Sequence, residues 1–382
     1  MIATEIAIRA GCPDARTLLA ASGTDAVMLA TFLVADSDCA PLTTIVVGIE
    51  ETGSGVAHAV IGCHFQSRTP KGVAVMPGAP VLPGRDLRRI ELPLRDARGA
   101  PLDLSVIDAA VVAAARQEIA AGRRVVVHRL DSSKTGLTAP SLACLSTLET
   151  EFGDRFTVLV DACQLRASTA SLAAYHRRGW PIVVTGSKFV TGPAFSGAII
   201  LPPATTLREP ELPGYDRAEA PAPGVLLRWR AALEEWRRFD ALSESDKAKA
   251  ARLFAHIAVA TLGGRSWVRP IDCAPRDRAA RGGWDATPTI FTFALRDAAG
   301  DSLGYDALRH LFFHLLKPDQ GVPAMRLGQP VRLGDSGLAA LRLAFDSRLA
   351  CILAEDSGAM RRITESLGEA LDRLEYAFDR MQ

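Results

Sequence analysis

The sequence lacks the charge excess and the long apolar runs that mark several large classes of protein. Its 382 residues carry 44 Lys and Arg against 43 Asp and Glu, so no overall field favours nucleic acid or an anionic membrane. The longest largely apolar run, Ala26–Val34, has about half the length that a bilayer span needs, and no basic segment precedes an apolar one at the N-terminus. We therefore expect a soluble, cytoplasmic protein with a small-molecule partner.

The cysteine pattern argues against disulfide bonds and against a cysteine-based metal site. Seven cysteines are scattered along the chain and none has the spacing C-x-x-C, which is typical of a reduced compartment without a disulfide framework or a zinc knuckle. His310 and His314 have the i, i+4 spacing of a metal pair on a helix, but no third ligand is evident and their neighbours are apolar. We predict a packing helix there and no metal.

The order of β-rich and helical segments predicts an α/β protein with two domains. Up to about Pro203, short β-rich runs alternate with helical periodicity, which is typical of a mostly parallel sheet flanked by helices. A Pro-rich linker is predicted at 202–224 and two connecting helices at 225–262. We predict a large domain at 1–262 and a smaller C-terminal α+β domain at 263–382. The predicted strands of the large domain are Thr43–Ile49, Arg89–Leu94, Arg124–His128, Phe156–Val160, Ile182–Val184 and Gly197–Leu201.

An aspartate and a lysine follow two of these predicted strands, Phe156–Val160 and Ile182–Val184. Asp161 ends one apolar run and Lys188 follows the next, 27 residues later, so both are expected at the C-terminal edge of the sheet. A partly desolvated lysine can form a Schiff base, and a buried carboxylate can keep a heteroaromatic nitrogen protonated. This combination predicts a pyridoxal phosphate (PLP) site with Asp161 and Lys188 as its catalytic residues.

A third segment precedes a predicted helix close to the N-terminus. Ser22, Gly23 and Thr24 place backbone N–H groups and hydroxyls at the start of that helix, where a phosphate group is favoured. Taken alone, the same residues would form an ordinary helix cap. Their position ahead of the aspartate and lysine segments favours a phosphate site.

These segments, in this order, resemble the fold type I family of PLP-dependent enzymes, and within it the class V aminotransferases and cysteine desulfurases. The resemblance implies that Asp161 pairs with the pyridine nitrogen and that Gln164 approaches the phenolic oxygen. It also implies that Lys188 forms the Schiff base and that Thr185 binds phosphate, and we include Ser187 among the cofactor-binding residues.

Three further residues follow from weaker matches to the family. Ser133 lies where the family has a loop beside the cofactor's O3′ oxygen, and Thr52 lies where a histidine usually stacks on the pyridine ring. Threonine cannot stack as imidazole does, so this match leaves the reaction open. Arg342 matches the arginine that binds the substrate carboxylate, with Arg348 as the alternative.

Other features depart from the family. Only 21 residues precede Ser22, and the segment Pro221–Gly224 has no threonine where the family sends one to the phosphate of the neighbouring subunit. No cysteine occurs from His314 to Leu341, where a desulfurase needs a nucleophilic thiolate, so desulfurase activity is disfavoured. The resemblance nevertheless implies a homodimer.

The sequence therefore predicts a PLP-dependent enzyme that acts on an α-amino acid through a Lys188 Schiff base, as an aminotransferase of class V type. A lyase that catalyses C–S or another β-elimination stays open, as do decarboxylation and racemisation. A different class of protein also stays open, namely an inactive pseudoenzyme or partner subunit with the same fold.

Overall fold

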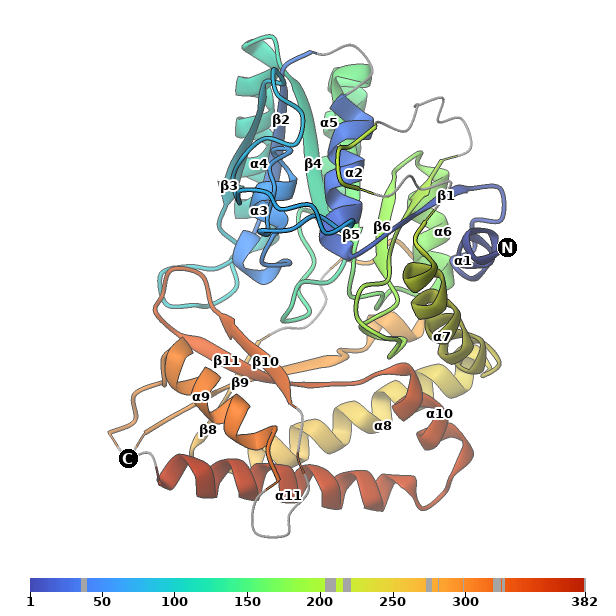
Figure 1. Cartoon of the computed structure of the whole chain (residues 1–382). Coiled ribbons are helices and arrows are strands. Elements are labelled where there is room, and N and C mark those ends of the chain that lie inside the picture. Colours follow the sequence, from blue (N-terminus) through green and yellow to red (C-terminus); the bar gives the residue numbers. More distant parts are fainter. Residues whose placement is uncertain are drawn as a thin grey trace.

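The chain folds around two β-sheets that lie one above the other in Figure 1. The computed structural model describes residues 1–35, 40–202, 211–215, 221–272, 277–280, 282–297, 299–318, 324 and 327–380. The predicted linker at 202–224 therefore lies partly outside the described residues, because 203–210 and 216–220 are not among them.

The larger sheet has seven strands, of which five form a continuous parallel array. The sheet order is β1-β7-β6-β5-β4-β2-β3, and β6, β5, β4, β2 and β3 run parallel, whereas β7 is antiparallel to both of its neighbours. The C-terminal ends of β4, β5 and β6 consequently lie at the same edge of the sheet. The strand bounds are β1 Arg16–Ala20, β2 Leu42–Val47, β3 Leu87–Leu92, β4 Arg124–Leu130, β5 Phe156–Ala162, β6 Ile182–Thr185 and β7 Gly197–Leu201.

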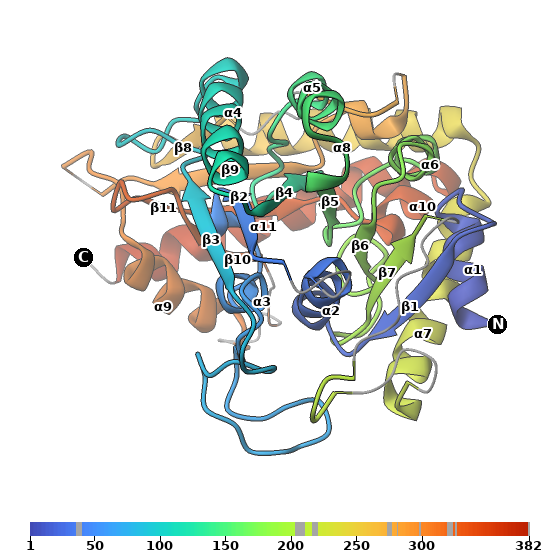
Figure 2. The same cartoon turned by 90° about the horizontal axis from the view of Figure 1, so that it is seen from above.

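Helices cover both faces of this sheet, as Figure 2 shows from above. On β4, Val125 and Val127 join one apolar cluster and Val126 joins the other, because successive strand side chains point to opposite faces. Helix α2 is buried from Asp25 to Ala35, as expected of a helix that is apolar on all sides. One face carries α4 (Leu104–Ala120), α5 (Leu142–Phe152) and α6 (Thr169–Arg177), and the other carries α2 (Gly23–Ala35) and α3 (Val56–Ala59).

The smaller sheet is antiparallel throughout, in the order β10-β11-β9-β8. Helix α8 packs against α10 and α11, and α11 lies lowest in the view of Figure 1. The bounds are β8 Val268–Ile271, β9 Ile290–Leu295, β10 Gly328–Arg332, β11 Ala339–Ala344, α7 Pro223–Asp240, α8 Glu244–Gly263, α9 Tyr305–Leu315, α10 Ser347–Glu355 and α11 Ala359–Asp379, with short 3₁₀ turns η1 Ile49–Glu51, η2 Gly153–Arg155 and η3 Trp284–Ala286.

The architecture confirms the predicted fold class, a mostly parallel sheet with flanking helices and a smaller α+β part. The domain boundary at 262/263 stays a prediction. Several short elements escaped the sequence pattern, namely α1 (Ile2–Arg9), β1, β8, β10 and α10. Strand β1 is held by its pairing with β7, about 180 residues away, and such pairing leaves no local signal. Within the described ranges, no helix combines the length and apolarity needed to cross a bilayer.

Candidate functional site

Asp161 lies next to the end of β5 and is enclosed by the neighbouring strands. It faces Leu130 of β4 and Val183 of β6 in the sheet register, and only 6% of the residue is exposed. The backbone N–H of Cys163 donates to its Oδ1 at 3.1 Å. Burial raises the pKa of the Asp161 carboxyl, and the charge of Asp131 adds to this, although the contacts with Cys163 oppose it. A carboxylate can accept several more hydrogen bonds, and a cationic N–H placed here would favour its charged form.

Lys188 lies in the loop between β6 and β7, and the next residue, Phe189, anchors this loop. Phe189 is buried and stacks on Trp284, with ring centroids 4.7 Å apart. The backbone N–H of Phe189 donates to the carbonyl of Gln164 at 3.3 Å, and the N–H of Thr191 donates to that of Lys188 at 3.0 Å. Lys188 itself is exposed. The loop thus fixes the backbone on both sides of a lysine that solvent can reach.

The start of α2 lies directly against the ends of β5 and β6. A Cβ atom on Gly23 would lie 2.7 Å from Cγ2 of Thr185 and 2.9 Å from Sγ of Cys163, so only glycine allows this approach. The hydroxyl of Thr185 donates to the carbonyl of Cys163 at 2.6 Å. The structure therefore brings the predicted phosphate turn together with the predicted phosphate threonine and the Asp161 segment.

The same turn also meets the segment that contains Thr52. A Cβ atom on Gly55 would lie 2.9 Å from Cγ2 of Thr24. Thr52 is buried, and its hydroxyl donates to the carbonyl three residues earlier at 2.6 Å. The backbone N–H of Asp25 donates to the Ser22 hydroxyl at 3.1 Å, which is the ordinary capping contact, and the hydroxyl itself donates to the Asp25 carboxylate. A phosphate here would consequently rely on backbone N–H groups more than on Ser22.

A buried ion pair lies beneath the loop that follows β4. The side chains of Glu51 and Arg95 are both fully buried and meet at 2.5 Å between Oε1 and Nε. The second carboxylate oxygen of Glu51 accepts hydrogen bonds from the hydroxyls of Ser133, at 2.6 Å, and Thr135. Ser133 therefore uses its hydroxyl inside this cluster, and its predicted role beside the O3′ oxygen stays a prediction.

Lys134, the next residue, connects this cluster with the smaller sheet. Its backbone N–H donates to the carbonyl of Glu51 at 2.9 Å and its Nζ donates to the carbonyl of Glu50 at 3.1 Å. Its own carbonyl accepts a 2.8 Å hydrogen bond from Nη1 of Arg342. Burial lowers the pKa of the Lys134 ammonium to about 8, and the positive charges of Arg342 and Lys188 add to the effect. The positive charges of Lys134, Arg342 and Lys188 are therefore close enough to act on one another.

Arg342 points from β11 toward the Lys134 loop. It is partly exposed, its Nε donates to the carbonyl of Gln329 at 3.1 Å, and burial lowers the pKa of the guanidinium to about 10. Arg348, the alternative, pairs with Glu235 of α7 at 2.8 Å, and 56% of its side chain is exposed. Of the two arginines, Arg342 is the one that contacts the Lys134 loop.

Arg166 joins the larger sheet to the smaller one close to the lysine loop. Its Nη1 donates to the carbonyls of Phe345, at 2.5 Å, and Thr289, at 3.2 Å. Its guanidinium carbon lies 5.6 Å from the ring centroid of Phe189, and the backbone N–H of Ser347 donates to the Phe189 carbonyl at 2.9 Å. These contacts fix the β11–α10 junction beside the loop that carries Lys188.

Several residues that organise this region were not predicted from the sequence. Glu51 and Lys134 are the direct neighbours of Thr52 and Ser133, which were predicted, so their charged side chains were the available signal. Arg95 and Arg166 had none, because their partners are distant in sequence. Gln164 and Ser187 lie beside the site and are partly exposed, and their side-chain roles stay predictions.

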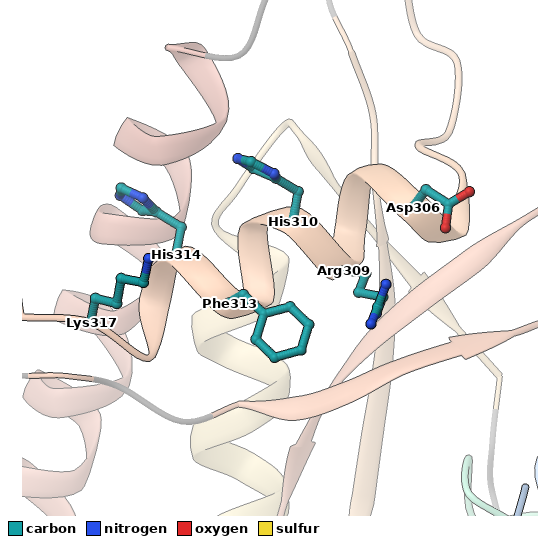
Figure 3. Close-up of a pocket in the computed structure, with 6 residues that line it drawn as sticks. All are labelled: Asp306, Arg309, His310, Phe313, His314 and Lys317. Carbon is teal, nitrogen blue, oxygen red and sulfur yellow. The ribbon is translucent and has the colours of Figure 1, made fainter.

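A separate depression of about 280 Å³ lies along α9 and does not adjoin these residues. In Figure 3, the imidazoles of His310 and His314 project from the same side of the helix. Within the described part of the chain, no group of three or more His, Cys, Asp or Glu side chains has an arrangement that could hold a metal ion. The residues that line the depression are Asp306, Arg309, His310, Phe313, His314 and Lys317.

Comparisons with known proteins found similarity at the level of structure. No family model matches the chain, and no curated protein sequence does. Among solved structures, Oryza sativa TDC crystallised with PLP matches with a TM-score of 0.57 and 13% identity, over 97% of this chain and 73% of that one. The Escherichia coli cysteine desulfurase CsdA matches with a TM-score of 0.56 and 16% identity, over 98% and 83% of the two chains. A NifS-like protein from Rickettsia africae gives 0.56 and 12%, over 97% and 87%.

These neighbours are PLP-dependent enzymes of fold type I, and the likeness covers nearly the whole chain. The protein therefore has the fold of that family, as the sequence motifs predicted. Identities of 12–16% support the fold alone, so the chemistry has to be argued from the residues of this chain.

Proposed function

We propose that this protein binds PLP and acts on an α-amino acid, with transamination as its reaction. The observation that carries the proposal is the contact of the Gly23 turn with Thr185 and with the Asp161 segment, at the edge where the Lys188 loop emerges. PLP, when bound, supplies an electron sink that makes a proton on the substrate Cα removable.

The residues present fit this cofactor at both of its ends. Backbone N–H groups of the Ser22–Thr24 turn, together with Thr185 and Ser187, would bind the phosphate at the start of α2. The absence of a side chain at Gly23 lets this turn lie against Thr185 and Cys163. Asp161 would accept a hydrogen bond from the protonated ring nitrogen, and this positive charge would favour the charged form of the buried carboxylate.

Three further residues would surround the ring in this proposal. Gln164 and Ser133 would lie toward the phenolic oxygen, and Thr52 would lie against the ring face. Thr52 offers a methyl group and no aromatic surface, so ring stacking would contribute less here than an imidazole provides.

Lys188 and Arg342 would act on the substrate. Lys188 would hold the aldehyde carbon of the cofactor and, once an amino acid has displaced it, carry the proton from Cα at its Nζ. Arg342 has N–H groups beyond those that bind the carbonyls of Lys134 and Gln329, and a guanidinium can bind the substrate α-carboxylate with two parallel hydrogen bonds.

Product analysis separates transamination from its rivals. Purified protein is incubated with PLP and single amino acids, and the expected result is conversion of the cofactor to its pyridoxamine form together with release of a 2-oxo acid. Release of ammonia without the pyridoxamine form would identify an eliminating lyase, and release of CO₂ a decarboxylase. Cofactor binding without any turnover would indicate a pseudoenzyme or partner subunit.

We also propose a homodimer, as is usual for this fold. Supporting it, the segment 66–80 is largely exposed although it carries Val73 and Met76, of which 53% and 73% are exposed. Leu227 of α7 is 68% exposed as well. Light scattering on the purified chain tests this proposal, which predicts twice the 40.7 kDa chain mass.

A further inference from the structure

Two cationic side chains, Lys134 and Arg342, lie at the edge of the proposed site, whereas one of them is enough to bind a single substrate carboxylate. Lys134 is within electrostatic range of both Lys188 and Arg342, and Arg342 binds the backbone of Lys134 directly, at 2.8 Å. Lys134 lies in the loop after β4 and Arg342 lies in β11, and Figure 1 shows these two strands in the upper and the lower sheet. A ligand between the sheets would meet both.

The negative charges of Glu51 and Glu50 act on Lys134 and raise the pKa of its ammonium, but the Glu51 carboxylate is bound by other groups. Both carboxylate oxygens of Glu51 are engaged, one by Arg95 and the other by the hydroxyls of Ser133 and Thr135. The Nζ of Lys134 donates one hydrogen bond to the backbone carbonyl of Glu50. An ammonium group has three N–H donors, so Lys134 can also donate to a ligand. Lys134 and Arg342 are also both partly exposed, among residues that are mostly buried.

We propose that Lys134 and Arg342 form a two-cation subsite that selects an α-amino acid with an acidic side chain. This inference rests on the proposed function, since Lys188 is what places the substrate Cα beside the pair. Arg342 binds one carboxylate through its guanidinium, and Lys134 binds the other through Nζ. A neutral substrate offers no carboxylate to the partly buried Lys134 ammonium, so it gains less binding free energy than an acidic substrate does.

The test measures binding of unreactive probes, so that it does not depend on turnover. Succinate carries two carboxylates and propionate carries one, and neither has the amine that would react with PLP. Calorimetric titration is run at about 0.15 M salt, which screens long-range attraction. The proteins are the wild type, Lys134→Met, Lys134→Arg, and Lys249→Met as a control at an exposed lysine of α8. Each is titrated with and without PLP.

The wild type is expected to bind succinate at least about tenfold more tightly than propionate, since a second charge-assisted hydrogen bond is gained. Lys134→Met should lose that preference and keep its propionate affinity, Lys134→Arg should restore part of it, and Lys249→Met should behave as the wild type. Equal affinities in the wild type, or an unchanged preference in Lys134→Met, would overturn the subsite.

Failure of the proposed function gives a different result. Absence of a PLP absorption band in the wild type would reject PLP binding, while a succinate preference that needs Lys134 would still support the subsite in the cofactor-free protein. A normal PLP band with no succinate preference would reject the subsite and leave the proposed function standing.

Discussion

The partly buried charge of Lys134 is predicted to destabilise the folded protein, and replacement of Lys134 by methionine tests this directly. The lowering of its pKa from 10.5 to about 8 corresponds to about 3.5 kcal/mol, at ~1.4 kcal/mol for each pH unit. Methionine keeps the apolar stem and removes the charge, but it loses the hydrogen bond to the carbonyl of Glu50, which is worth about 1 kcal/mol. The free energy of unfolding of Lys134→Met should therefore be about 2–3 kcal/mol higher than that of the wild type near pH 7, where the penalty is almost fully present.

The gain should disappear as the pH rises. Between about pH 8 and pH 10.5 the unfolded chain binds more protons at Lys134 than the folded chain does, so the penalty falls to about 1 kcal/mol near pH 10. The lost hydrogen bond then offsets it, and variant and wild type should be about equally stable. Urea unfolding of the cofactor-free proteins, followed by tryptophan fluorescence and by circular dichroism, gives both values, and Lys249→Met serves as the control. A variant that is less stable near pH 7, or a difference that does not change with pH, would refute the reasoning.

Three other substitutions test the remaining parts of the site. Gly23→Val should weaken PLP affinity by at least about tenfold, because side-chain atoms would collide with Thr185, and fluorescence titration measures this. Glu51→Gln should lower the free energy of unfolding by about 3–5 kcal/mol, since it leaves a buried arginine unpaired, whereas Glu151→Gln at an exposed pair should change it by less than about 1 kcal/mol. Asp161→Asn should reduce the turnover rate by about a hundredfold or more while the protein stays folded, because an amide does not stabilise a charged ring nitrogen.

The sequence predicted the central sheet well because its strands are buried on both faces. The runs before Asp161 and Lys188 are almost purely apolar, and their order along the chain matches their neighbouring positions in the sheet. The sequence also placed Gly23 at the start of a helix, but the close approach of this glycine to Thr185 and Cys163 came only with the structure. The apolar runs and the helix start are local, and local features can be read from one sequence.

The parts that were not predicted depend on contacts between distant residues. Arg95 and Glu51 are 44 residues apart, and Arg166 reaches a carbonyl 179 residues away. Nothing in the sequence distinguishes these arginines from those on the surface. The hydrogen bond from the Ser133 hydroxyl to the Glu51 carboxylate was not predicted either, since these residues are 82 positions apart, and the expected role of Ser133 beside a cofactor oxygen stays a prediction.

The most direct test of the proposed function is the identity of the lysine that holds PLP. The purified protein is incubated with PLP, reduced with borohydride, digested and mapped by mass spectrometry. The cofactor is expected on the peptide that contains Lys188, with loss of the visible absorption band on reduction, and Lys188→Ala should take up none. Lys134 is an informative internal alternative, because its lowered pKa also makes its amine reactive near neutral pH. Attachment at Lys134, or no covalent cofactor at all, would contradict the proposed site.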